Sequence, residues 1–510
     1  MNIQKRTAES GDVYAYYIEK LHKYGAYQVI RVNQESKSIC YIALDYLGNE
    51  PPELMSIESL QPYYRQAFRW NHNIVKELIN NSPVPRDYLF IGQCSLKTDD
   101  KCNTFAGGWP KGLEYIYEER WKAFDENARA AYKKYCNSGD FVTVKGKMFR
   151  KNKIGLTDDL YQCLTEKDSL KDFPCIIFAE VNGYSGKLVK WCRETPLLAK
   201  LKLKNAGVEL LDLSDTHLDH LELDLSGVKR LVLPESLVSL QIYGNISNEL
   251  QIDDRLCAER IELRISAKSA HALRFGMNNV KISMLKIDDI TELDLQPVAG
   301  AFPEVEDIRL DGRPGTLSNL RALGQMHGLK NIYVQDLFGY GSQDLDFLSE
   351  LPGLRELDFD SIPKEAGVYL KKKWKGKLDI CSITHLREEG WMRENLENPL
   401  RHWDGSEFVP AAAYKGAVKC YKDTKKSLEA AHDRAEIEMI VRQYTRKFNE
   451  LNEKYDEFIE TEEREDIFAA MQQLYEECIL HGKCGETDET NAGITLGEIW
   501  NIMDGERDDW

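Results

Sequence analysis

The sequence predicts an α+β protein with three parts: a small β-barrel-like amino-terminal domain with helices, a central solenoid of short repeats, and a helical carboxy-terminal region. Three observations predict this class. Short aromatic and β-branched runs fill residues 10–60, apolar-x-apolar triplets recur from residue 201, and helical periodicity dominates residues 411–481. The expected domains are, in order, residues 1–170, 195–382 and 383–510.

The amino-terminal domain is expected to open as a small antiparallel barrel with an SH3-like start. Residues 13–16, 24–32 and 38–44 are short strand-forming runs separated by turn-prone segments. Residues 113–136 then carry apolar side chains at three- and four-residue steps, which predicts a helix. We therefore expect both strands and helices before the repeats begin.

The central region repeats one small unit about every ten residues between residues 201 and 263. Each triplet fits a short strand with its outer two side chains inward and its middle one outward. One such unit buries too little apolar surface to be stable alone, so the repeats must stack. The triplets begin at Leu201, Leu211, Leu221, Leu231, Leu240, Leu250 and Ile261.

One unit carries a specific motif. Residues 233–245 read LPESLVSLQIYGN, which resembles the short bacterial leucine-rich repeat L-P-x-x-L-x-x-L-x-(I/V)-x-x-N at every fixed position. Units near 317–334 and 345–359 resemble the longer L-x-x-L-x-x-L-x-x-L-x-L pattern, so the pitch changes near residue 300. The resemblance spans residues 195–382 and implies a leucine-rich-repeat solenoid that presents a concave strand face to a partner.

The middle residues of the triplets are the candidate partner-binding residues. They are expected to line one concave face in register, about 4.8 Å apart between neighbouring strands. Most are acidic, and a tyrosine among carboxylates is typical of a face that binds a basic partner. Polar residues that only solvate a sheet would give the same pattern. The candidates are Asp212, Glu222, Gln241, Glu262, Asp294, Arg309, Tyr333, Asp358 and Asp379.

The charge distribution narrows the class of partner. The net charge is −17, and residues 451–510 alone contain 18 acidic and 4 basic side chains. This acidity disfavours nucleic acid and anionic membranes and favours a basic protein, although a solvated acidic tail would explain it equally well. Because no run approaches the roughly 18 apolar residues of a membrane span and no secretory signal opens the chain, we expect a cytoplasmic protein.

No motif points to catalysis, a cofactor or a metal. The 12 cysteines include no Cys-x-x-Cys pair, and the glycine-rich segment 106–112 lacks the pattern of a phosphate-binding loop. His217, Asp219 and His220 have suitable types for zinc, but they fit better as polar residues at an exposed turn. The cysteine–aspartate signature of bacterial ubiquitin ligases with leucine-rich repeats is absent. We expect a protein that is not an enzyme.

The amino-terminal strands suggest a function. Gly11-Asp12-Val13-Tyr14, followed by residues 24–30, resembles the opening of the Immunity protein 26 family of bacterial polymorphic toxin systems. The resemblance covers about 50 residues and, with the repeats and the acidic end, implies an immunity protein. Such a protein would occlude the active site of a cognate toxin domain, expected to be basic and to act on nucleic acid. The alternatives are a repeat sensor or scaffold in a defence assembly, and a host-directed effector.

Overall fold

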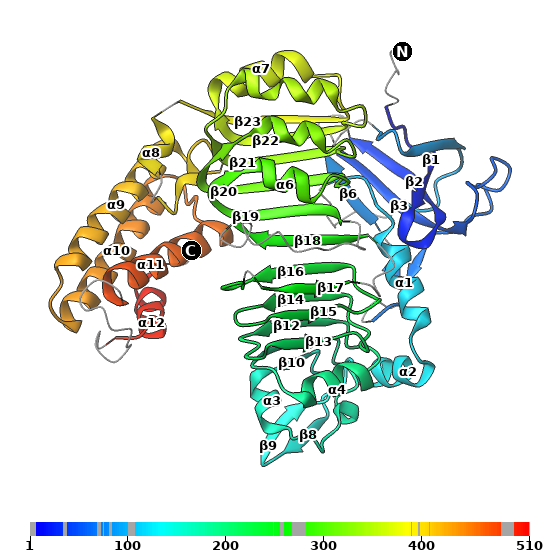
Figure 1. Ribbon diagram of the computed structural model, residues 1–510, viewed down its shortest axis with the longest axis horizontal. Coiled ribbons are helices and arrows are strands. Elements are labelled where there is room, and N and C mark those ends of the chain that lie inside the picture. The colour runs from blue at the N-terminus through cyan, green and yellow to red at the C-terminus, as the bar shows by residue number, and fades with distance from the viewer. Residues whose placement is uncertain are drawn as a thin grey trace. The chain divides into compact units, whose positions relative to one another are not determined.

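The computed structural model divides the chain into two compact units, residues 1–386 and 387–510 (Figure 1). Helices and strands are both abundant, and the first unit contains a small antiparallel sheet followed by a large parallel one. The structure describes residues 7–33, 38–68, 73–74, 76–80, 84–99, 108–247, 249–254, 260–267, 282–388, 390–395, 398–406, 408–480, 494–508 and 510.

The small sheet has five strands in the order β6-β3-β2-β1-β7. Alternation along the strands buries Tyr14, Tyr27 and Tyr41, and the Tyr115 hydroxyl donates hydrogen bonds of 2.7 Å to the carbonyls of Ala26 and Leu44. The described strands form an open sheet whose edges are β6 and β7. Its strands are β1 (Asp12–Ile18), β2 (Lys23–Asn33), β3 (Ser38–Gly48), β6 (Lys76–Asn80) and β7 (Tyr88–Gln93).

The helix expected over residues 113–136 is two helices, α1 (Leu113–Ala123) and α2 (Glu126–Tyr135). The break falls at Asp125, whose carboxylate accepts a hydrogen bond of 2.9 Å from the Ala128 amide and so caps α2. Short elements accompany them: η1 (Glu19–Leu21), the pair β4 (Tyr64–Arg65) and β5 (Asn73–Ile74), and the hairpin β8 (Phe141–Val144) and β9 (Lys147–Arg150).

The large sheet has eleven strands in nearly sequential order, and its pairs are parallel from β10 to β22. It starts at Gly155, inside the segment that the sequence assigned to the amino-terminal domain. The strands are β10 (Gly155–Thr157), β11 (Phe178–Asn182), β12 (Lys200–Lys204), β14 (His220–Asp224), β16 (Ser239–Tyr243), β18 (Ile261–Ser266), β19 (Ile282–Asp294), β20 (Asp307–Ser318), β21 (Asn331–Phe338), β22 (Glu356–Pro363) and β23 (Ile380–Arg387).

A second parallel sheet of three strands takes every other triplet of the ten-residue repeat. These strands are β13 (Leu210–Asp212), β15 (Arg230–Val232) and β17 (Gln251–Asp253). Consecutive triplets therefore alternate between the two sheets, so the strands of one sheet begin about 20 residues apart rather than ten. The expectation that all triplets line one face was wrong, because alternate triplets belong to different sheets.

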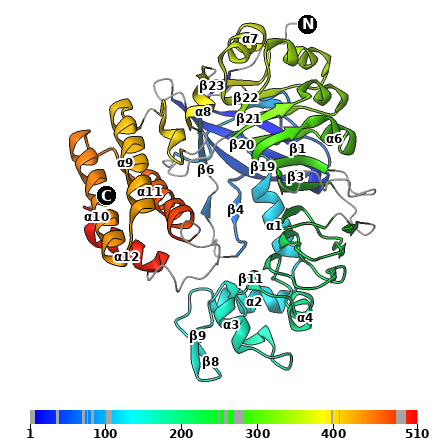
Figure 2. The ribbon, with the colours of Figure 1, turned by 60° about the vertical axis from the view of Figure 1, so that its left-hand side comes forward.

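After β17, helical elements take the place of the second sheet, and these helices share one core with the large sheet. In-register residues such as Leu203, Leu223, Ile242 and Ile265 are fully buried. The helical elements that follow β10 are α3 (Asp158–Cys163), η2 (Leu170–Asp172), α4 (Gly186–Glu194), α6 (Leu295–Ala301), η3 (Leu320–Gln325), η4 (Ser342–Glu350) and α7 (Lys364–Trp374). Figure 2 shows α6 and α7 beside the strands of these coils.

The second unit is helical, as expected for residues 411–481. Its own core contains Trp403, whose ring lies 6.4 Å from that of Phe448 and whose Nε1 donates to Asp466. Within the described residues, no helix is at once long enough and apolar enough for a membrane crossing. The elements are α8 (Trp391–Asn395), η5 (Arg401–Trp403), α9 (Ala411–Ala430), α10 (Arg434–Lys454), α11 (Thr461–Leu474), the π-helical η6 (Tyr475–Leu480) and α12 (Leu496–Glu506).

Candidate partner-binding face

The candidate site is the outward face of the large sheet, which consists of rows of side chains set by the strand register. One row, here called the central row, is followed from β12 to β22 and contains six charged side chains. Its members are Lys202, Glu222, Gln241, Arg264, Lys286, Arg309, Tyr333 and Asp358. A second row, here called the leading row, lies two residues earlier on each strand. It contains Glu262, Met284, Asp307, Asn331 and Glu356.

Five of the nine candidate residues lie in the central row: Glu222, Gln241, Arg309, Tyr333 and Asp358. Glu262 lies in the leading row, and Arg264 takes the central position on its strand. The segment Ile261–Ile265 alternates over two overlapping triplets, so the sequence alone could not fix which polar residue continues the row.

Three candidates lie elsewhere, and the expectation of a single face was wrong for them. Asp212 is on β13 in the other sheet and accepts hydrogen bonds from the amide and hydroxyl of Ser214. Asp294 caps α6 by accepting a hydrogen bond of 2.9 Å from the Gln296 amide. Asp379 precedes β23, is 8% exposed, and lies 3.1 Å from the Arg86 guanidinium of the amino-terminal domain.

A chain of alternating charges occupies the middle of the face. Lys286 Nζ lies 3.2 Å from the Asp288 carboxylate and 2.6 Å from that of Asp311, and Arg264 also pairs with Asp288. Burial disfavours the ionised form of Asp288 and of Asp311 and so acts to raise the pKa of each. Hydrogen bonds from Arg264 and Lys286 outweigh burial at Asp288, whose pKa is lowered, but not at Asp311, whose pKa is raised. Arg264 and Lys286 are therefore each paired with a neighbouring carboxylate on the same face.

An aromatic side chain adjoins this chain of charges. The Arg309 guanidinium carbon lies 4.5 Å from the centroid of the Tyr333 ring, and Arg309 Nε lies 3.2 Å from Asp307. The Tyr333 hydroxyl donates a hydrogen bond of 2.6 Å to Glu356. Burial and the Glu356 carboxylate hold the pKa of Tyr333 well above its usual value, so the hydroxyl stays a donor.

The first three outward positions of strand β22 are acidic: Glu356, Asp358 and Asp360 alternate with the buried Leu357 and Phe359. The hydrogen-bond partners of the three carboxylates are hydroxyl groups and one imidazole: Tyr333 for Glu356, Ser382 for Asp358, and Thr384 and His385 for Asp360. Burial raises the pKa of Asp358, and the neighbouring Asp360 and Glu356 raise it further. Negative charge is therefore concentrated along this strand.

A cavity of about 200 Å³ opens between the charged chain and β22. Its lining combines three carboxylates with two cations, Lys286, which pairs with Asp311, and Arg309, which lies over the Tyr333 ring. The carboxylates of Asp358 and Asp360 are the groups of this lining that suit an arginine or lysine side chain of a partner. The lining residues are Lys286, Arg309, Asp311, Tyr333, Val334, Gln335, Asp358 and Asp360. Of these, the sequence had indicated only Arg309, Tyr333 and Asp358. The central-row residues Arg264 and Lys286 could also have been found from the sequence, because each is the middle residue of an apolar-x-apolar triplet, Leu263–Ile265 and Leu285–Ile287.

The histidine-containing turn next to β14 has a structural partner. Asp219 is buried, forms an ion pair with Arg120 of α1, and lies 2.6 Å from His220 Nδ1. His217 is exposed. The turn was expected to be exposed throughout, but Asp219 instead links α1 to the parallel sheet. Across the described ranges, no group of three His, Cys, Asp or Glu side chains is arranged to hold a metal ion.

The fold and this face define a mixed helix-and-strand protein whose large parallel sheet carries a charged surface with an acidic strand at one side. Searches against protein-family models, curated proteins and solved structures found no match to the chain.

Proposed function

We propose that this chain is a cytoplasmic, non-enzymatic leucine-rich-repeat protein of the immunity class. It neutralises a basic toxin domain by covering the toxin's active site with the outward face of the large sheet. The observation that carries the proposal is the acidic strand β22, with Glu356, Asp358 and Asp360, beside the paired side chains of Arg309 and Tyr333.

The repeat class is supported by the way the coils add to one another. Each coil extends the large sheet by one parallel strand, and its leucines pack directly above those of the preceding coil. Strands begin about 20 residues apart near Lys200 and His220 and about 25 apart near Asn331 and Glu356. These spacings fit the 20–29 residues of leucine-rich repeats.

A basic partner is supported by the balance of charge on the face. The cations Arg264, Lys286 and Arg309 each have a carboxylate neighbour, whereas the β22 carboxylates accept hydrogen bonds mainly from neutral groups. An approaching lysine or arginine would therefore be attracted to this strand, where His385 Nδ1, 2.6 Å from Asp360, is the imidazole partner of the three carboxylates. Toxins that act on nucleic acid carry basic active sites, so the same face would both attract and occlude one.

The test is co-expression with the carboxy-terminal toxin domain encoded by the neighbouring reading frame. We expect the wild-type chain to restore growth and to copurify with the toxin domain. The double variant Asp358→Asn with Asp360→Asn should lose both effects, whereas Glu350→Gln should keep both. Glu350 is a matched control because it is exposed at the end of η4, in the same coil as β22.

The second candidate function, a sensor or scaffold in a defence assembly, gives a different result. A scaffold would form a complex through the same face without restoring growth. No toxin gene beside the coding sequence, or neither rescue nor complex, would contradict the immunity proposal.

A further inference from the structure

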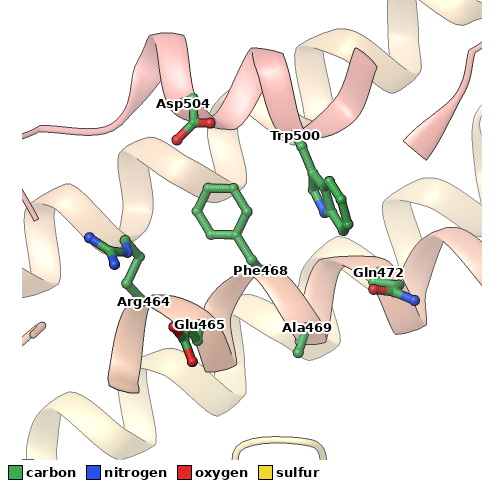
Figure 3. A pocket seen from close by; sticks show the side chains of 7 residues that line it. All are labelled: Arg464, Glu465, Phe468, Ala469, Gln472, Trp500 and Asp504. Carbon is green, nitrogen blue, oxygen red and sulfur yellow. The ribbon is translucent and has the colours of Figure 1, made fainter. Parts of the chain in front are cut away.

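The helical unit has a groove between α11 and α12 that the proposed function does not use. Its volume is about 410 Å³, within the range of roughly 300–1,000 Å³ typical of ligand sites. Figure 3 shows the Phe468 ring projecting from α11 toward α12 and the Trp500 ring projecting back toward α11. The lining residues are Arg464, Glu465, Phe468, Ala469, Gln472, Trp500 and Asp504.

The two aromatic side chains lie beside the buried core of this unit, and Phe468 packs against that core while remaining partly exposed. On α11, Ile467 is one of the buried residues, and Phe468 follows it at a half-buried position. On α12 the buried residue is Ile499, and Trp500 follows it with 39% of its surface exposed. On each helix, therefore, a residue that is buried in the core is followed directly by an aromatic residue whose ring faces the groove. Exposed aromatic anchors beside a groove are typical of sites that hold a partner's apolar side chains.

The charge around the groove selects the partner. Residues 451–510 contain 18 acidic and 4 basic side chains, and Glu465 and Asp504 lie on the groove itself. Arg464 is the basic residue of the lining, and Arg507 Nε lies 2.9 Å from the Asp504 carboxylate. A second copy of this chain would bring net charges of −17 together, which opposes self-association. A cationic segment would be attracted instead.

We infer that this groove binds a basic amphipathic helix of a partner protein, with apolar side chains of that helix between Phe468 and Trp500. Helix-in-groove recognition requires apolar anchors at i, i+3, i+4 and i+7. Basic residues on the remaining faces would lie over Glu465 and Asp504. The inference is independent of the toxin-binding proposal, because it concerns another unit and other residues.

The experiment uses the full chain and a dye-labelled synthetic peptide of leucine and lysine, with leucine at those helical spacings. Fluorescence anisotropy should show binding that weakens as salt is added. A peptide with glutamate in place of lysine should not bind. Trp500→Ala, and separately Glu465→Lys with Asp504→Lys, should each weaken binding about tenfold or more. Met439→Ala should leave it unchanged, because Met439 is 52% exposed on α10, outside the groove.

Three results would overturn the inference. Equal binding of the lysine and glutamate peptides would remove the charge argument. Unchanged affinity of Trp500→Ala, with unchanged circular dichroism, would place the peptide elsewhere. Sedimentation of the protein alone tests the other occupant, since a dimer that Trp500→Ala dissociates would assign the groove to a second copy of this chain.

Discussion

The guanidinium of Arg309 lies over the ring of Tyr333, 4.5 Å from its centroid, and the Tyr333 hydroxyl donates to Glu356. This relationship joins side chains from β20, β21 and β22, three neighbouring strands of the parallel sheet. Stacking and hydrogen bonding fix two long side chains before a partner arrives. Less conformational entropy is therefore lost on binding.

Removal of the Tyr333 hydroxyl should cost stability. Tyr333→Phe keeps the ring under Arg309 but removes the hydrogen bond to Glu356, so we expect unfolding to become easier by about 1–2 kcal/mol. Urea denaturation measures this. Tyr243→Phe is the matched control on the same face, because the Tyr243 hydroxyl is buried without a hydrogen-bond partner in the described part of the chain. That control should be neutral or stabilising, and equal losses in both variants would contradict the argument.

Asp379 should act on stability rather than on partner binding. Asp379→Ala leaves Arg86 without its carboxylate and should destabilise the protein by about 1–2 kcal/mol, because Asp379 is mostly buried. Asp215→Ala should cost under about 0.5 kcal/mol, since its pair with Arg193 is exposed. If Asp379→Ala instead lowers partner affinity at unchanged stability, the contact with Arg86 is not its role.

Glu306 should contribute to acid sensitivity. Burial opposes its ionisation, but hydrogen bonds from Arg260 and Lys330 outweigh burial and lower its pKa below 4.5. A depressed carboxyl pKa stabilises the fold above the unfolded value and loses that contribution as pH falls through the folded value. Glu306→Gln should be less stable than wild type at pH 7, and the difference should shrink below about pH 4.5. Denaturation midpoints across this range test it, and a constant difference would contradict it.

Two glycines should be required where β19, β20 and β21 approach one another. A Cβ at Gly312 would lie 2.1 Å from the Asp336 carbonyl oxygen, and one at Gly315 would lie 2.1 Å from that of Ile290. Since neither contact is with a flexible side chain, Gly315→Ala should cost about 1–3 kcal/mol or more. Gly300→Ala in α6 is the control, because no atom lies within 4 Å of its added Cβ. Thermal melting should show a loss for Gly315→Ala only.

Much of the fold could be predicted from the sequence, because strand alternation and leucine spacing are local signals. The triplets at Leu201, Leu221 and Leu240 are strands, and four helices lie within residues 411–480 of the described chain. The alternation of early triplets between two sheets could not be predicted, since triplets facing either sheet have the same apolar pattern. The turn geometry between them decides which sheet each triplet joins.

The site was predicted in part for a related reason. Arg309, Tyr333 and Asp358 lie in register because the segments between their parallel strands have nearly equal length. Asp294 was predicted on this face but is not part of it, because the chain turns into α6 directly after Asp294 and the Asp294 carboxylate caps that helix. Asp379 was also predicted on this face, but its carboxylate instead contacts Arg86, which is distant in sequence. Neither effect is visible in the pattern of apolar residues.

The most direct test of the central claim is calorimetric titration of the toxin domain into wild-type protein and into the Asp358→Asn, Asp360→Asn double variant. Burial already raises the pKa of Asp358, so its neutral replacement should not destabilise the fold. We expect affinity to fall about tenfold or more and its dependence on salt to weaken, while Glu350→Gln keeps the wild-type value. Unchanged affinity and salt dependence in the double variant would contradict the assignment of this face as the partner-binding site.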